Sequence, residues 1–210
     1  MIQIMEIIRL TDDTHRQTIQ KTLDVLARGG IVLYPTDTLY GLAVDAHNPS
    51  ALARLRLLKG RETKKPISIV APSVQALDTY VHWNDIARGL AERHLPGALT
   101  LVLPATAQVP EELQLIGQVG VRVPADTFSL ALASAFGRAF TATSANRSGM
   151  KTSETVEEIL AQFGPRISEI DLVIDAGERA GGAGSTVVTF REGVPYILRE
   201  GLISRTELGL

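Results

Sequence analysis

The sequence predicts an α/β protein in which helices flank a single twisted, mixed sheet. Helix and strand patterns intermix along all 210 residues, sometimes as strand, helix, strand and sometimes as adjacent strands. No linker or change in composition divides the chain, and it contains no fixed-period repeat. With 45% hydrophobic and 21% charged residues, its composition is that of a globular protein. We therefore expect residues 1–210 to form one domain.

In the first half of the chain, helices are predicted by caps, apolar spacing and glycine stops. Asp12 or Asp13 can cap the first helix, and Asn48-Pro49 supplies the cap and first position of the second. Short apolar or β-branched runs predict the strands. The expected elements are a helix at 14–28, strands at 31–34 and 39–44, a helix at 48–58, a strand at 66–70, helices at 73–80 and 84–94, and a strand at 99–103.

The second half continues this alternation. Ser153 or Thr155 can cap its second helix, which Gly164-Pro165 ends. The expected elements are a strand at 120–123, a helix at 128–136, a strand at 140–142, a small polar loop at 143–149, a helix through 159 and 163, and strands at 172–174, 186–190 and 196–198, with a glycine-rich turn at 181–184.

Charge and residue usage exclude several classes of protein. The net charge of −2 means that the chain as a whole does not attract nucleic acid or acidic membranes, so an anion site must be local. The absence of cysteine excludes disulfides, thiolate metal sites and cysteine nucleophiles. The first ten residues do not fit a signal peptide, and no apolar stretch reaches the roughly 18 residues of a membrane span. We expect a cytoplasmic protein without a membrane segment.

Common catalytic signatures are missing from the sequence. It contains no P-loop and no Gly-x-Ser-x-Gly elbow. The glycine-rich turn at 181–184 precedes a strand instead of a helix, which is a poor fit to a Rossmann phosphate turn. The four histidines lie singly, so no zinc site is predicted.

Segments at the expected strand ends carry the cations, hydroxyls and glycines that an anion-binding cleft requires. Residues 59–65 hold four cations, which could clamp a phosphate or simply cap a helix C-terminus. Residues 141–149 contain almost nothing that could fill a core, and their short polar side chains could hold a ligand or form Asx and Ser turns. Residues 35–42 place two hydroxyls and a carboxylate after a strand, where a simple turn is the alternative.

Single residues in two further strands extend this pattern. Arg122 points away from the two flanking valines and lies near Gly120, which leaves room for a ligand, although an exposed edge-strand arginine has the same pattern. Ser185 and Arg199 could belong to the same anion-binding site, although neither residue alone is strong evidence for one.

Together and in this order, these segments resemble the YrdC/TsaC family of threonylcarbamoyl-AMP synthases. The matching motifs extend from about residue 13 to residue 205. They are Pro35-Thr36-Asp37-Thr38 with Tyr40-Gly41-Leu42, Lys59-x-Arg61, Val121-Arg122-Val123-Pro124, Thr143-Ser144-Ala145-Asn146 with Ser148-Gly149, Gly184-Ser185-Thr186-Val187-Val188, and Leu198-Arg199-Glu200-Gly201.

The resemblance implies a YrdC-like α/β fold with a positively charged concave cleft. It implies a nucleotidyltransferase that joins L-threonine, bicarbonate and ATP into threonylcarbamoyl-AMP and releases pyrophosphate. Mg²⁺ would be carried by the nucleotide, with no metal site in the protein. The product would serve threonylcarbamoyladenosine modification of tRNA through partner proteins, and binding of tRNA or double-stranded RNA is a possible further property.

The resemblance also implies roles for individual residues. The catalytic residues would be Lys59, Arg61, Ser144 and Asn146. The nucleotide would be bound by these four together with Thr143 and Arg199. L-threonine would be bound by Thr36, Thr38, Arg122 and Ser185.

The sequence departs from the family pattern at two places. Glu62 follows Arg61 where many members have proline, and Val70 with Ala71 occupy the stretch where some members have a histidine that helps to hold threonine. We also expect the chain to be the short form of the family, without the extra C-terminal domain of longer relatives. An alternative interpretation is therefore a YciO-type paralogue that binds a nucleotide or RNA without this activity.

Overall fold

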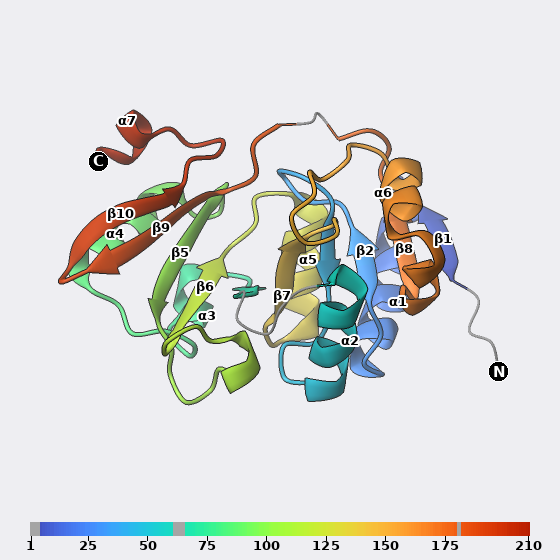
Figure 1. The fold of residues 1–210 in the computed structure, drawn as a ribbon, viewed down its shortest axis with the longest axis horizontal. Coiled ribbons are helices and arrows are strands. Elements are labelled where there is room, and N and C mark those ends of the chain that lie inside the picture. The colour runs from blue at the N-terminus through green and yellow to red at the C-terminus, as the bar shows by residue number, and fades with distance from the viewer. Residues whose placement is uncertain (1–4, 61–65, 180–181) are drawn as a thin grey trace.

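The computed structural model describes residues 5–60, 66–179 and 182–210, in which ten strands and seven α-helices occur (Figure 1). The strands are β1 (Glu6–Arg9), β2 (Val32–Tyr34), β3 (Gly41–Ala43), β4 (Ser68–Val70), β5 (Leu99–Pro104), β6 (Gln118–Arg122), β7 (Phe140–Ser144), β8 (Leu172–Asp175), β9 (Thr186–Arg191) and β10 (Val194–Arg199). The helices are α1 (His15–Ala27), α2 (Pro49–Lys59), α3 (Val74–Leu77), α4 (Asp85–His94), α5 (Thr127–Phe136), α6 (Val156–Phe163) and α7 (Arg205–Leu208), with 3-10 turns η1 (Glu111–Leu113) and η2 (Gly164–Glu169).

The strands form one sheet in the order β1-β8-β2-β3-β7-β4-β6-β5-β9-β10. Strands β1 and β8, β8 and β2, β4 and β6, and β5 and β9 pair in parallel, and the remaining neighbours are antiparallel. Strands far apart in the sequence therefore lie side by side, as β9 beside β5 does (Figure 1). The predicted mixed sheet with flanking helices is confirmed.

The two faces of the sheet are covered differently. Along β2, Leu33 packs in a large core cluster, whereas Val32 and Tyr34 pack in a smaller one on the opposite face, as the two-residue period of a strand requires. The large cluster includes residues of α2, α3, α4, α6 and α7. The smaller one includes residues of α1 and α5 together with β2, β3, β7, β8 and the end of β4. On the face that carries the smaller cluster, helices α1 and α5 thus do not cover β6, β5 and β9.

Helix α2 begins and ends where the sequence predicts. Asn48 Oδ1 accepts a hydrogen bond from Ala51 N at 3.1 Å, and Pro49 occupies the first turn. Gly60 ends the helix with φ +57°, a left-handed conformation that favours glycine. Lys59 is therefore the last residue of the helix.

The structure differs from the expected elements in three details. Strand β1 was not predicted, because its residues are mostly exposed and show no alternation of polar and apolar side chains. Helix α7 was missed although Ser204 and Glu207 form a capping box, since it is a single turn. The prediction that Asp12 or Asp13 caps α1 was wrong: the cap is Thr14, whose hydroxyl instead donates to Arg9 O at 2.9 Å.

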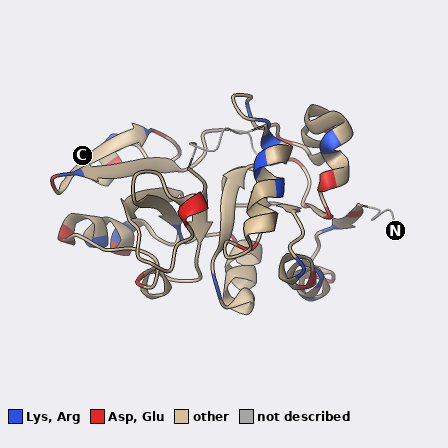
Figure 2. Ribbon diagram, turned by 60° about the horizontal axis from the view of Figure 1, so that its bottom comes forward, with Lys and Arg blue, Asp and Glu red and all other residues tan. Residues whose placement is uncertain are grey.

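Basic and acidic residues are both spread over the helices and loops of the surface (Figure 2). Within the described residues, no helix has the length and apolar character needed to cross a membrane.

Candidate functional site

A cavity of about 770 Å³ lies over the part of the sheet that α1 and α5 leave uncovered. It is bordered by β7, β4, β6, β5 and β9 and by the loops next to them. Tyrosines aside, its polar lining residues are Thr36, Thr38, Ser68, Thr100, Gln118, Arg122, Thr143, Ser144, Asn146, Thr152, Ser185, Thr189, Arg191 and Arg199.

Small residues from three neighbouring strands form the floor of this cavity. Gly120 of β6 lies between Ser68 of β4 and Thr100 of β5, and the registers of these strands put all three on one face. A Cβ atom at residue 120 would lie 2.4 Å from Ser68 Oγ and 3.3 Å from Thr100 Cγ2. Glycine is therefore needed here to keep Ser68 in place and the floor deep.

Thr36 shapes the turn between β2 and β3. Its hydroxyl donates to Leu39 O at 2.5 Å and accepts from Thr38 N and Leu39 N at 3.1 and 3.2 Å. The hydroxyls of Thr36 and Thr38 lie 3.0 Å apart. This network holds both side chains on the cavity wall.

Arg122 lies at the end of β6 and is 8% exposed. Its Nε donates to Gly97 O at 3.0 Å, and its Nη2 forms an ion pair with Asp37 Oδ1 at 2.5 Å. Nη1 lies 3.4 Å from Thr38 Oγ1. Because a guanidinium has five N–H donors, these three contacts leave others for a planar anion in the cavity.

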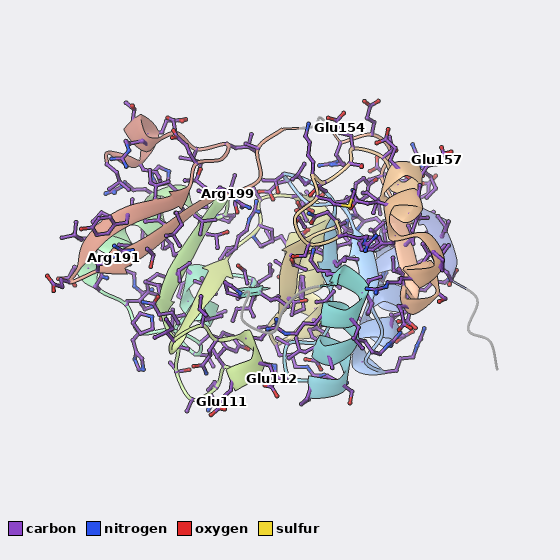
Figure 3. All side chains as sticks on the ribbon, in the orientation of Figure 1. Glu111, Glu112, Glu154, Glu157, Arg191 and Arg199 are labelled. Carbon is purple, nitrogen blue, oxygen red and sulfur yellow. The ribbon has the colours of Figure 1, made fainter. Side chains whose placement is uncertain are left out.

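Arg199 reaches the same cavity from the end of β10 (Figure 3). Its Nε and Nη2 donate to Ser185 O at 3.2 and 2.8 Å, and Ser185 Oγ in turn lies 2.8 Å from Thr100 Oγ1. Partial burial, and secondly the charge of Arg122, lower the pKa of Arg199. The positive charge of Arg122 acts on Arg199, and an anion between the two guanidinium groups would relieve this repulsion.

Lys59 approaches the cavity from behind. It is only 2% exposed, and its Nζ donates to Ser144 O and, at 3.3 Å, to Asn146 Oδ1. Ser144 Oγ donates to Asn146 Oδ1 at 2.5 Å, and Asn146 Nδ2 donates to Met150 O. Lys59 therefore holds the loop after β7 in the shape that places Ser144 and Asn146 on the cavity wall.

The structure brings most of the predicted site residues to one place. Those that line the cavity are Thr36, Thr38, Arg122, Thr143, Ser144, Asn146, Ser185 and Arg199. Lys59 contacts two of them from behind the wall. Arg61 lies outside the described residues. The functional role of each of these residues stays a prediction.

Sequence reasoning assigned no role to Asp37, Ser68 or Thr100. The contact of Asp37 with Arg122 could not be predicted, because the two residues are 85 positions apart in the sequence. Ser68 and Thr100 could have been found, because a polar residue at the alternate positions of a buried, apolar strand indicates a face that no helix covers. Among the described residues, no group of three or more His, Asp or Glu side chains is placed to hold a metal ion.

The fold and the site together define an α/β protein whose mixed sheet carries an open polar cavity lined by three arginines, Arg122, Arg191 and Arg199. Residues 24–201 match the Sua5, YciO and YrdC family, which is described as "Telomere recombination". The chain belongs to this family, and the resemblance inferred from its motifs is confirmed.

Three relatives illustrate the similarity. A threonylcarbamoyl-AMP synthase of Thiobacillus denitrificans is 38% identical over 149 residues, which cover 70% of this chain and 79% of that protein. The crystal structure of P. abyssi Sua5 complexed with L-threonine superimposes with a TM-score of 0.88 and has 31% sequence identity to this chain. The match covers 98% of this chain and 59% of Sua5. Escherichia coli YciO is 25% identical with a TM-score of 0.85, covering 95% of this chain and 97% of YciO. The chain thus spans 59% of the length of Sua5 but nearly all of YciO.

Proposed function

We propose that this chain is an L-threonylcarbamoyladenylate synthase, which forms threonylcarbamoyl-AMP and pyrophosphate from L-threonine, bicarbonate and ATP. Its relationship to threonylcarbamoyl-AMP synthases supports this activity. The main structural support is the convergence of Arg122, Arg199 and the Ser144–Asn146 loop on one cavity. The carbamate of threonine and ATP are both anions, and a cavity lined by three arginines and many hydroxyls suits them.

In the proposed mechanism, bicarbonate takes up a proton and loses water to give carbon dioxide. The neutral amine of threonine attacks this carbon dioxide and releases a proton, which balances the one taken up, to give a carbamate. A carbamate oxygen then attacks the α-phosphorus of ATP, while the bond from that phosphorus to the bridging oxygen breaks and pyrophosphate leaves. The carbamate already carries its nucleophilic charge, so no dedicated general base is required. The protein contributes positioning and charge stabilisation.

Each predicted residue has a place in this mechanism. Arg122 pairs with the carboxylate of threonine, and Thr36, Thr38 and Ser185 bind its other polar atoms. Arg199 stabilises phosphate oxygens. The nucleotide is held by Thr143, Ser144, Asn146, Lys59 and Arg61, with Lys59 acting through the loop that it anchors.

Further expectations accompany this proposal. Mg²⁺ enters with the phosphates of ATP, since this ion is usually bound through substrate phosphates and water. Residues 1–210 act as one YrdC-like domain with a positively charged cleft, in the cytoplasm. Partner proteins transfer the threonylcarbamoyl group to tRNA, and the chain binds tRNA or double-stranded RNA.

The test is to incubate the purified protein with L-threonine, bicarbonate, Mg²⁺ and ATP and to measure pyrophosphate and the labile adenylate. We expect both products only when threonine and bicarbonate are present. Arg199→Gln should lower the rate, while Arg88→Gln, a surface variant that loses only the contact of Arg88 with Asp78 and Trp83, serves as the control. Pyrophosphate release that ignores threonine and bicarbonate would exclude the activity.

A second candidate is the YciO-type function, binding of a nucleotide or RNA without adenylate formation. The presence of Val70 and Ala71 in place of the histidine favours it. Salt-sensitive RNA affinity in a protein that releases no pyrophosphate would support this alternative.

A further inference from the structure

Of the three arginines that line the cavity, Arg191 lies over the ring of Tyr196, and the other two, Arg122 and Arg199, have different electrostatic surroundings. Arg122 forms an ion pair with Asp37, and the side chains of the two residues are only 9% and 14% exposed. Arg199 contacts the carbonyl and hydroxyl of Ser185, and no carboxylate within the described parts of the chain forms an ion pair with it. One arginine is neutralised and the other is not.

Asp37 is held rigidly in this position. Its Oδ1 accepts from Arg122, and its Oδ2 accepts from Ala125 N at 3.2 Å. Its own backbone N–H donates to Asp126 Oδ2 at 3.1 Å, and Asp126 caps α5 through Ser129 N at 2.7 Å. Asp37 lies behind Arg122 and is not part of the cavity lining. It therefore acts on a ligand only through its charge and through the orientation of Arg122.

We propose that Asp37 is a specificity-determining residue that reserves Arg122 for a singly charged carboxylate and leaves Arg199 for phosphate groups. A polyanion beside Arg122 meets the negative charge of Asp37 at close range in a poorly solvated wall, where such repulsion is strong. A carboxylate with one charge meets less repulsion and still gains the hydrogen bonds of the guanidinium. The side chain of Asp37 thus determines specificity by excluding polyanions from Arg122.

This inference rests on the proposed function, because it assigns the two anionic substrates to the two arginines. Without Asp37, pyrophosphate or the phosphates of ATP would occupy the place of the amino acid. Arg122 would then attract polyanions as Arg199 does, and L-threonine would have to compete with them.

The test uses isothermal titration calorimetry with inorganic pyrophosphate and with L-threonine on the full chain. In Asp37→Asn, which keeps the size and one acceptor oxygen, the Kd for pyrophosphate should fall at least about fivefold, and pyrophosphate should now displace L-threonine. Asp78→Asn is the matched control: it removes the carboxylate of another aspartate–arginine pair, that of Arg88, which is not part of the cavity lining, and it should leave the Kd for pyrophosphate unchanged.

A second variant checks that the effect passes through Arg122. The gain in pyrophosphate affinity should disappear in Asp37→Asn/Arg122→Gln, a neutral pair that keeps the local shape and also serves if the single variant does not fold. An unchanged Kd for pyrophosphate in folded Asp37→Asn, or an equal gain in Asp78→Asn, would overturn the inference.

The outcomes also separate this inference from the proposed function. If wild-type protein neither binds L-threonine nor forms the adenylate, the proposed function fails, while the pyrophosphate comparison still tests the role of Asp37. If wild-type protein is active and Asp37→Asn shows no competition between pyrophosphate and threonine, only the inference fails.

Discussion

One face of the sheet carries different residues in its two halves. Under α1 and α5 this face holds large apolar side chains such as Val32, Phe140 and Leu172, each at most 1% exposed. Beyond α5, on β4 and β5, it holds Ser68 and Thr100 beside the cavity. The strands and their pairing continue across the border. The comparison teaches that residue size and polarity on one face, and not strand structure, decide whether a helix covers that face or a cavity remains.

The largest expected effect is on stability in the covered half. Phe128 of α5 is 2% exposed and packs edge-on against His15, with ring centroids 5.7 Å apart. Phe128→Ala should lower the free energy of unfolding by about 3–5 kcal/mol, because it leaves a cavity in the smaller core. Urea denaturation measures this loss, and the rate of pyrophosphate release well below the melting temperature should stay near wild type. An unchanged free energy of unfolding in Phe128→Ala would contradict the view that apolar packing stabilises the covered half.

In the uncovered half, adding volume should be harmful. Gly120→Ala places a methyl group 2.4 Å from the present position of Ser68 Oγ, so we expect a loss of roughly 1–3 kcal/mol in the free energy of unfolding. The same variant should raise the KM for L-threonine or ATP, since the floor of the cavity becomes shallower. Ser68→Ala added to Gly120→Ala should restore most of the stability. A double variant as unstable as the single one would contradict this account of the floor.

The contribution of Lys59 should appear in turnover. Lys59→Met keeps the length of the side chain but loses the hydrogen bonds to Ser144 O and Asn146 Oδ1, so the loop loses its anchor. We expect about a tenfold lower rate of pyrophosphate release, which equals about 1.4 kcal/mol of transition-state stabilisation. Arg54→Met, on the same helix, removes contacts with Glu169 and Asp171 instead and should leave the rate unchanged. Equal rates for wild type and Lys59→Met would refute the anchor.

The smallest effect concerns pH at the border of the two halves. Burial raises the pKa of Asp126, against the hydrogen bond from Ser129 N. The folded state therefore holds this proton more tightly than the unfolded state, whose pKa is about 3.9, and wild-type stability declines as pH rises above that value until the folded group has ionised. Asp126→Asn removes this decline. Urea denaturation between pH 4 and pH 7 should show that the free energy of unfolding of the variant increases relative to that of wild type as the pH rises. A difference that does not change with pH would contradict a raised pKa of Asp126.

Much of the fold could be predicted from local patterns. The boundaries of α2 follow from Asn48, Pro49 and Gly60, whose roles depend only on their immediate neighbours. Strand β1 could not be predicted, because it exists through parallel pairing with β8, more than 160 positions away. Its residues carry no alternating pattern of their own.

The candidate site divides in the same way. Residue types in order along the chain pointed to Arg122, Arg199 and the Ser144–Asn146 loop, because cations and short polar side chains at strand ends suit an anion. They did not reveal that Arg122 is paired with Asp37, or that Lys59 is buried behind the wall. Such pairings depend on distances between elements, which composition and spacing do not encode.

The sequence by itself determined the α/β class, most helices and strands, and segments whose cations and short polar side chains line the cavity, since caps, periodicity and side-chain charge are local properties. Only the tertiary structure decided the strand order, the uncovered half of one sheet face, and the different partners of the two arginines. These depend on long-range pairing, in which β7, β4, β6 and β5 become neighbours although their order along the chain is different. Electrostatic pairing follows distance in space, and that distance exists only once the chain has folded.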